Sequence, residues 1–284
     1  MFAHVNGIKL YFDVDGSGLV ADGPQMVERP VVILVHGGPG GDHTVYKPDY
    51  APLTEVAQVV YYDHRGNGRS DFSDPDHWTL DQWADDLFAL CQYLGVDQPI
   101  IVGASFGGFV AQAYAQRYPD NLAKLALIST AAKMDFETVF AAFERLGGKH
   151  VGAVARAYWE TPTDESRLAY REICVPFYSV KLAENDDWLK RIIWKNETAL
   201  HFNGPNNEQG RMDFTKTLSG LKCPLLIMSG MEDPIMPIEF SREMQRCAPD
   251  HLVEFHAVEE CRHLTMVDQP ERCIGILKKF VASI

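Results

Sequence analysis

The sequence lacks the features that would mark a membrane, exported or metal-binding protein. No apolar run approaches the ~20 residues that a membrane-spanning helix needs. The first residues show neither the basic start nor the apolar stretch of a signal peptide. No two of the six cysteines form a C-x-x-C pair, which disfavours a zinc or redox site. We therefore expect a cytoplasmic protein with reduced thiols, no metal, no cofactor and no membrane partner.

Positive charge is also scarce. The chain has 26 Lys and Arg residues against 39 Asp and Glu residues, a formal net charge of -13. An acidic surface repels nucleic acid, which is therefore not expected as a partner. With 46% hydrophobic and 23% charged residues over 284 positions, the composition is otherwise typical of a globular protein. That length accommodates one large α/β domain with an insertion and carries no signature of an oligomeric state.

Apolar runs alternate with amphipathic stretches along most of the chain, which predicts a doubly wound, mostly parallel α/β sheet. A continuous apolar run such as residues 31–35 is typical of a strand that is buried on both faces. The remaining expected strands lie at 59–62, 98–102, 122–129, 225–228 and 252–255, and the expected helices at 46–57, 79–94, 108–115, 237–247 and 271–281. A hairpin with its turn at Asn6-Gly7 and a loop over 16–24 precede them.

The strand pattern stops between about residues 131 and 212, where helical, aromatic-rich segments replace it. Because this stretch follows an expected strand, it should lie above the carboxyl ends of the sheet, where ligands bind in such folds. We therefore predict a core of residues 1–130 and 213–284 and a helical cap of residues 131–212. Candidate substrate-binding residues of the cap include Trp159, Phe177 and Tyr178.

The segment Gly103-Ala104-Ser105-Phe106-Gly107 stands between an expected strand and an expected helix. Strand, G-x-S-x-G, helix is the pattern of a nucleophile elbow, a tight turn that lifts a serine hydroxyl clear of the sheet. The backbone N–H groups that follow the serine lie at a helix N-terminus, where they favour negative charge. This pattern predicts Ser105 as the nucleophile of a hydrolase.

A serine nucleophile needs a base within hydrogen-bond reach, and that base needs an acid to orient it. After an elbow of this kind the partners follow in the order Ser, Asp or Glu, His. Asp233 and His263 lie in loops that follow the expected strands at 225–228 and 252–255. Both loops are at the sheet edge that carries Ser105, so we predict Asp233 as the orienting acid and His263 as the base.

Other downstream residues are weaker candidates for these two roles. Glu232 is an alternative acid, although we expect its side chain to point elsewhere. His251 precedes the last expected strand and lies at the wrong end of the sheet, and His256 extends that strand.

Acyl transfer also needs two N–H donors where negative charge develops on the substrate oxygen. One should be the N–H of Phe106, the residue after the nucleophile. The other should come from the glycine-rich loop at 36–41, which follows the first core strand. We predict Gly38 as this donor, with Gly37 as the alternative, because glycine lets the backbone approach the substrate closely.

Taken together, these pieces resemble the α/β-hydrolase superfamily along almost the whole chain, and within it the proline iminopeptidase-like group. The matching segments are His36-Gly37-Gly38-Pro39-Gly40-Gly41, Asp63-His64-Arg65-Gly66-Asn67-Gly68-Arg69-Ser70, the elbow with Gly108, Gly230-Met231-Glu232-Asp233 and Arg262-His263. The resemblance implies an α/β-hydrolase fold and a cofactor-free Ser-His-Asp hydrolase. It also implies that the turn at 63–65 braces the loop below the site.

Aminopeptidases of this group are similar in holding the free α-ammonium of the substrate with glutamates. The segment 197–204 resembles their cap motif, with one extra residue before Phe202, so the resemblance makes Glu197 the candidate ammonium ligand. A second glutamate can directly follow the catalytic Asp, but Pro234 stands at that position here. One carboxylate anchors a cation less well than two, so this departure keeps esters and lactones open as substrates.

The sequence therefore predicts a serine hydrolase that cleaves an ester or amide bond of a small substrate through an acyl-enzyme intermediate. A proline iminopeptidase-like aminopeptidase or amidase and a lactonase are the alternatives within that class. A small-molecule receptor that keeps the fold but catalyses nothing is the alternative from another class.

Overall fold

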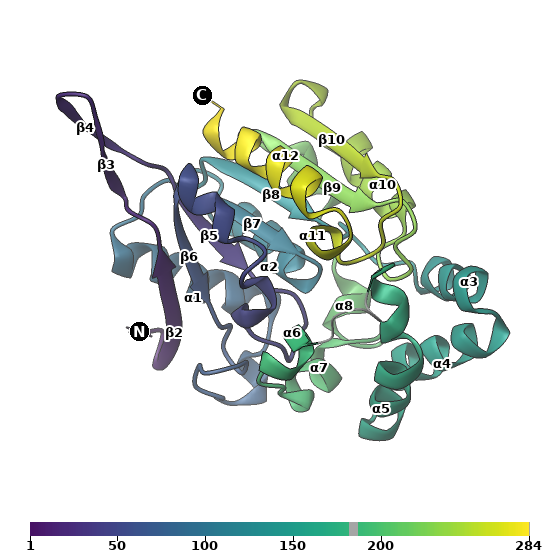
Figure 1. Cartoon of the computed structure of the whole chain (residues 1–284). Helices are drawn as coiled ribbons and strands as arrows, with labels where there is room; N and C mark the ends of the chain where they lie inside the picture. The colour runs from purple at the N-terminus through teal and green to yellow at the C-terminus, as the bar shows by residue number, and fades with distance from the viewer. Residues whose placement is uncertain (182–186, 284) are drawn as a thin grey trace.

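The computed structural model describes residues 1–181 and 187–283, and an eight-stranded sheet runs through it in the order β1-β2-β6-β5-β7-β8-β9-β10 (Figure 1). β1 and β2 are antiparallel to their neighbours, and all pairs from β6 to β10 are parallel. The strands are β1 (Phe2–Val5), β2 (Ile8–Asp15), β5 (Val31–Val35), β6 (Gln58–Tyr62), β7 (Ile100–Ala104), β8 (Lys124–Ile128), β9 (Leu225–Gly230) and β10 (Val253–Val258). The predicted doubly wound, mostly parallel sheet is confirmed.

Helices connect the strands and cover both faces of the sheet (Figure 1). The α-helices are α1 (Leu80–Leu94), α2 (Phe106–Arg117), α3 (Phe136–Gly147), α4 (Lys149–Glu160), α5 (Asp164–Ile173), α6 (Asp187–Arg191), α7 (Asn196–Phe202), α8 (Glu208–Arg211), α9 (Thr215–Ser219), α10 (Ile238–Cys247), α11 (Thr265–Asp268) and α12 (Pro270–Ala282). Short 3-10 helices are η1 (His43–Tyr46), η2 (Ala51–Glu55), η3 (Pro75–His77), η4 (Val175–Tyr178) and η6 (Asp250–Leu252).

The apolar run of β5 shows how the sheet is buried. Ile33 and Val35 belong to the core cluster that also holds side chains of α1, α2 and α10. Val32 and Leu34 point the other way, into the cluster that holds side chains of η2 and α12. Successive side chains of a strand alternate between faces, so a strand covered on both sides must be apolar at every position.

Local signals set several element boundaries as predicted. The hairpin turn at Asn6-Gly7 has positive φ at both residues, 45° and 77°, as a two-residue turn between twisted strands requires. Thr79 caps α1 by accepting a hydrogen bond from the N–H of Gln82, and Gly95 ends the helix in the left-handed conformation with φ 70°.

Two local predictions are wrong. Residues 16–24 do not form only a loop, because β3 (Leu19–Asp22) pairs with β4 (Gln25–Glu28) in a separate two-stranded hairpin. The expected helix at 46–57 is broken into η1 and η2, since Pro48 and Pro52 cannot donate the backbone hydrogen bonds that a continuous helix needs.

Between β8 and β9 the chain forms the helices α3 to α9, and the described residues there contain no strand. Figure 1 shows α3, α4 and α5 on the opposite side of the molecule from the β3–β4 hairpin. Across residues 1–181 and 187–283, no helix is both long and apolar enough to cross a bilayer. From here on the segment 131–212 is called the insertion.

Candidate active site

Ser105 occupies a strained turn between β7 and α2. Its backbone has φ 54° and ψ -124°, a combination that side-chain-bearing residues adopt only where the surroundings hold them there. Two hydrogen bonds hold it: the Ser105 N–H donates to the Ile128 carbonyl at 3.0 Å, and the Thr130 hydroxyl donates to the Ser105 carbonyl at 2.8 Å. The role of Thr130 has no sequence signature, because it depends on β8 lying beside β7.

The glycines around Ser105 are required by close backbone contacts. A Cβ on Gly107 would overlap the Val35 carbonyl, and a Cβ on Gly103 would overlap the Gly107 carbonyl. A Cβ on Gly108 would lie about 2.5 Å from the Thr130 side chain. The elbow therefore packs directly beneath the end of β5, which no side chain at these positions would allow.

Asp233 and His263 are hydrogen-bonded to each other, as the sequence pattern predicts. His263 Nδ1 lies 2.8 Å from Asp233 Oδ2, and both residues are buried. Asp233 Oδ1 accepts the N–H groups of Ile235 at 2.8 Å and Met236 at 2.9 Å. A carboxylate only accepts hydrogen bonds, so the short contact with Asp233 Oδ2 places the hydrogen of His263 on Nδ1. Nε2 is then the ring nitrogen that can accept a proton.

The loops that carry these two residues are joined through their backbones. The N–H of Met231 donates to the Val258 carbonyl at 2.9 Å, and the N–H of Glu232 donates to the Cys261 carbonyl at 3.0 Å. A Cβ on Gly230 would overlap the Cys261 and Arg262 carbonyl oxygens, the latter more closely. The contact between Asp233 and His263 is therefore built into the backbone and not left to flexible side chains.

The alternative residues lie elsewhere. The Glu232 side chain is half exposed and its Oε2 lies 3.9 Å from Arg262 Nε. His256 is part of β10 and its Nε2 lies 2.7 Å from Glu254 Oε1. His251 precedes β10 in η6.

Ser105 and His263 line the same cavity, which has a volume of about 500 Å³. That volume is within the ~300–1,000 Å³ range of pockets for small molecules. The Ser105 hydroxyl makes no hydrogen bond to His263 in the part of the chain that the structure describes. In unliganded enzymes this contact is often long and shortens when substrate binds.

Gly37, Gly38 and Phe106 also line the cavity. Gly38 has φ 132°, which leaves its backbone in a conformation that favours glycine. Across the described ranges, the N–H groups of Gly38 and Phe106 have no protein acceptor. They are therefore free to donate to a substrate oxygen in the cavity.

A pair of buried histidines supports this glycine-rich loop, and the sequence analysis missed it. His36 Nε2 accepts the backbone N–H of His64 at 3.2 Å, so Nδ1 carries the hydrogen and donates to the Gly37 carbonyl at 2.7 Å. His64 Nε2 in turn donates to the His36 carbonyl at 3.1 Å. Burial lowers the pKa of both imidazoles, that of His64 strongly. Two neutral imidazole rings can therefore pack with their centroids 4.2 Å apart without charge repulsion.

The turn that begins at Asp63 braces the same loop, as the family resemblance implies. Asn67 Oδ1 accepts the N–H of Gly40 at 2.6 Å, which fixes the far end of the loop. The Arg65 guanidinium donates to both carboxylate oxygens of Asp86 at 2.7 and 2.8 Å, and both side chains are buried. A bidentate pair of this kind fixes the geometry of the turn.

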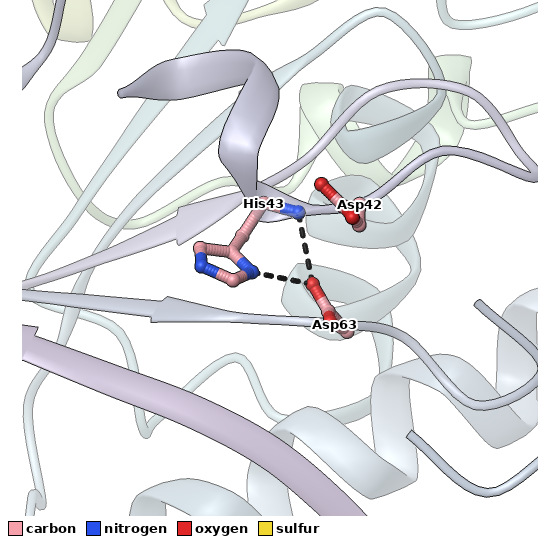
Figure 2. Close-up of side chains that lie close together, drawn as sticks. All are labelled: Asp42, His43 and Asp63. Atoms are coloured by element: carbon pink, nitrogen blue, oxygen red, sulfur yellow. Dashed lines mark hydrogen bonds and ion pairs between the residues drawn. The ribbon is translucent and has the colours of Figure 1, made fainter. Parts of the chain in front are cut away.

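Asp42, His43 and Asp63 form a compact acidic cluster beside the loop (Figure 2). Figure 2 shows one Asp63 oxygen accepting from both the backbone N–H and Nδ1 of His43, at 2.9 and 2.6 Å. The other Asp63 oxygen accepts the Arg69 N–H at 2.8 Å, and Asp42 Oδ2 accepts from Arg69 Nη1 at 3.1 Å and from the Ile193 N–H at 2.9 Å. Because N–H donors already occupy these oxygens, the cluster is a hydrogen-bonded joint between core and insertion and does not suit a metal ion.

The structure brings only some of the predicted substrate-binding residues to the cavity. Trp159 and Tyr178 line it, and the Tyr178 ring packs edge-on against His263 at 5.3 Å. Phe177 does not line it, because its ring faces the Arg262 guanidinium at 5.8 Å.

Glu197 does not line the cavity either. The helix α7 turns its Thr198 and Ala199 side chains inward, and the helical period leaves Glu197 exposed. Thr198 uses the buried position to donate to the Gly66 carbonyl at 2.7 Å. An ammonium ligand at residue 197 is therefore not supported by this geometry.

The comparisons with known proteins bear on the family and the fold. The model of the α/β hydrolase fold family matches residues 30–270. Proline iminopeptidase of Lacticaseibacillus rhamnosus is 25% identical, covering 88% of this chain and 89% of that protein. Proline iminopeptidase of Clostridium botulinum is 28% identical, covering 89% of this chain and 90% of that protein.

Solved structures extend the comparison to other hydrolases. A thermophilic esterase from Thermogutta terrifontis superimposes with a TM-score of 0.74 at 27% identity, covering 98% of this chain and 96% of that one. The enol-lactonase from Burkholderia xenovorans LB400 superimposes with a TM-score of 0.69 at 24% identity over the whole of both chains, a likeness of fold. The predicted fold and the predicted family group are both confirmed.

Proposed function

Because the chain belongs to the α/β-hydrolase family, we propose that it is a serine hydrolase that cleaves an ester or amide bond of a small substrate with Ser105, His263 and Asp233. One observation carries the proposal. His263, joined at 2.8 Å to the buried Asp233, lines the same cavity as a serine held in a strained elbow. Strain maintained by the surrounding structure at one residue of a cavity is typical of a functional site.

In the proposed reaction, Ser105 Oγ is the nucleophile and His263 Nε2 transfers the protons. Ser105 Oγ attacks the substrate carbonyl carbon, and its proton passes to His263 Nε2. The bond to the leaving group breaks as His263 returns that proton to the departing oxygen or nitrogen. Water, deprotonated by the same nitrogen, then attacks the acyl-enzyme and restores the Ser105 hydroxyl. Asp233 stays ionised and stabilises the positively charged imidazole.

We assign the oxyanion site to the N–H groups of Phe106 and Gly38. Both line the cavity, and the Phe106 N–H opens α2, where the helix dipole favours negative charge. The bracing by His36 keeps Gly37 and Gly38 in place before the substrate arrives. Gly37 remains the alternative donor.

An ester or lactone is favoured over an aminoacyl amide as the substrate. The aminopeptidase interpretation rests on the names of the sequence relatives, and it needs carboxylates to hold an α-ammonium. Glu197 is exposed outside the cavity, and Pro234 replaces the second carboxylate. An uncompensated ammonium in a partly dry pocket is costly.

We further propose that the insertion, residues 131–212, acts as a cap over the core, residues 1–130 and 213–284. Its Trp159, Tyr178 and Arg167 form part of the wall of the cavity that Ser105 also lines. The backbone N–H of Leu264, next to His263, donates to the Tyr178 carbonyl at 3.0 Å. The insertion thus supports the catalytic histidine as well as closing the cavity.

The test compares two chromogenic substrates with and without the nucleophile. We expect the wild-type protein to hydrolyse 4-nitrophenyl butyrate, and Ser105→Ala to lower kcat by roughly 10⁴-fold or more. Release of nitroaniline from L-prolyl-4-nitroanilide should be far slower, because neither Glu197 nor residue 234, which is Pro, places a carboxylate in the cavity for the ammonium.

Ser219→Ala, at the exposed end of α9, is the matched control and should retain wild-type turnover. Near-wild-type turnover in Ser105→Ala would contradict the proposal. Rapid, Ser105-dependent cleavage of the anilide would establish the aminopeptidase instead. If a fluorophosphonate failed to label Ser105 and neither substrate were cleaved, the non-catalytic receptor would be the better description.

A further inference from the structure

The cavity wall contributed by the insertion carries two arginines one helical turn apart. Arg167 and Arg171 both belong to α5 and both line the cavity. Arg167 is only 7% exposed, whereas Arg171 lies at the exposed rim. Like charges four residues apart on a helix repel each other. Their placement together at the cavity therefore needs a compensating interaction.

The described part of the chain offers Arg167 only neutral partners. Its Nε donates to Asn196 Oδ1 at 2.9 Å and its Nη1 donates to the Tyr158 hydroxyl at 2.9 Å. Its Nη2 lies about 3.4 Å from where a Cβ on Gly40 would be, so it faces the glycine-rich loop and makes no hydrogen bond to a described residue. A charge this deeply buried is costly without an anion nearby.

Arg171, nearer the rim of the cavity, also lacks an acidic partner among the side chains that the structure describes. Its guanidinium lies over the Trp194 ring at 4.7 Å, and that of Arg167 lies over the same ring at 5.9 Å. Burial and the neighbouring charge of Arg167 lower the pKa of Arg171. Within residues 1–181 and 189–283, neither arginine forms an ion pair.

Further hydrogen-bond donors without acceptors surround the pair. The Trp159 Nε1 hydrogen is buried and has no partner among the described residues. The Tyr158 hydroxyl accepts from Arg167 and from Asn203 Nδ2 at 2.7 Å, so its own hydrogen remains available. Asn203 Oδ1 is a buried acceptor without a partner among the described residues, so that buried free donors outnumber buried free acceptors among these side chains.

None of the acidic residues that line the cavity, Asp42, Asp49 and Glu172, forms an ion pair with Arg167 or Arg171. Asp42 is already occupied by Arg69 and backbone N–H groups. Burial raises the pKa of Asp49, and the nearby charge is that of Arg191. Glu172 is exposed.

We propose that the substrate carries a carboxylate, held by Arg167 and Arg171 while Ser105 attacks a carbonyl carbon in the same cavity. This inference rests on the proposed hydrolase function and specifies its substrate class. A planar guanidinium with a free Nη2 suits a carboxylate oxygen, and the second arginine adds charge at the rim. The same pair repels an α-ammonium, which is the opposite of what an aminopeptidase of this group requires.

Two esters of equal acyl length test the charge preference directly. We expect kcat/KM for mono-4-nitrophenyl glutarate to exceed that for 4-nitrophenyl valerate by at least about tenfold at low salt, as one charge-assisted hydrogen bond allows. The preference should shrink as salt screens the rim charge. Equal kcat/KM for the two esters, with both hydrolyses dependent on Ser105, would overturn the carboxylate site and leave the proposed function standing.

Arg171→Gln is the main variant, because its side chain lies at the rim and folding should tolerate the change. It should lower kcat/KM for the glutarate ester, chiefly through KM, at least about tenfold more than for the valerate ester. Arg156→Gln is the matched control, since Arg156 is an exposed arginine of α4 that pairs with Glu137 and Glu160. Equal losses on both esters in Arg171→Gln would contradict the proposal.

A binding measurement separates this inference from the proposed reaction. Glutarate should raise the Tm of the Ser105→Ala protein, and the Arg171→Gln change should abolish that shift. If wild-type protein hydrolysed neither ester yet showed the Arg171-dependent shift, the anion site would stand and the proposed function would fall. Absence of the shift at millimolar glutarate would overturn the anion site.

Discussion

The two walls of the cavity differ in how completely their polar groups are paired. On the core wall, Asp233 has hydrogen-bond donors on both oxygens, and the Ser105 backbone is held from two sides. On the insertion wall, Arg167 and Trp159 keep donors that no described residue satisfies. Polar groups that are already hydrogen-bonded fix the geometry of the reacting atoms before substrate binds, whereas buried groups without partners can bind polar atoms of a ligand. In the proposed function, the core wall therefore supplies the chemistry and the insertion wall the choice of substrate.

The largest expected effect tests the core wall. Asp233→Asn should lower kcat for 4-nitrophenyl butyrate by up to about 10⁴-fold, because an amide no longer stabilises the correct tautomer and the charged imidazole. Glu232→Gln is the matched control, since Glu232 is the adjacent, half-exposed carboxylate. It should stay within about twofold of wild type. The reverse result would make Glu232 the acid and contradict the assignment of Asp233.

The second prediction concerns the backbone that supports the core wall. Gly107→Ala should lower Tm by roughly 10 °C, because the new Cβ would overlap the Val35 carbonyl and neither backbone can move freely. Gly275→Ala in α12 is the control, since a Cβ there meets no atom within 4 Å. It should stabilise the protein by about 0.5–1 kcal/mol through helix propensity. Similar melting curves for the two variants would show that the elbow is not the close contact described.

The smallest effect concerns the cluster of Asp42, His43 and Asp63, the hydrogen-bonded joint between core and insertion. Burial alone would raise the pKa of Asp63, but the hydrogen bonds from His43 and the electrostatic attraction of the His36 and His43 imidazoles together outweigh it and lower that pKa. A depressed carboxyl pKa stabilises the fold above the unfolded value of about 3.9, and that stability disappears as pH falls through the folded pKa. The Tm of Asp63→Asn should therefore fall less than the Tm of wild type between pH 5 and pH 3.

Asp120→Asn serves as the control for that titration, because Asp120 is an exposed residue whose partner Lys222 is also exposed. Its Tm should fall with pH as steeply as that of wild type. A parallel fall in Asp63→Asn would mean that this joint does not contribute to acid sensitivity.

Much of the core could be predicted from the sequence, because its signals are local. The elbow needs glycines within two residues of Ser105, and parallel strands buried on both faces must be apolar throughout. Once strands and loops alternate, the carboxyl ends of β9 and β10 must meet at one edge, which brings Asp233 to His263. The hairpin β3–β4 was missed because its two strands are only four residues long and exposed along almost their whole length, so they show no alternation of buried and exposed positions.

The insertion wall was not predictable in the same way. Its short helices do not pack as part of a sheet, so no strand pattern sets their orientation. The sequence could therefore not show which side of α7 faces inward. In the structure Glu197 is exposed and Thr198 is buried. The arginines of α5 look like ordinary surface residues until tertiary packing places them at the cavity. Local sequence alone thus determined the fold, the elbow and the order of the Ser, Asp and His residues, because short-range backbone sterics and strand periodicity encode them. Only the tertiary structure decided which insertion side chains face the elbow, because that depends on how helices distant in sequence pack against it.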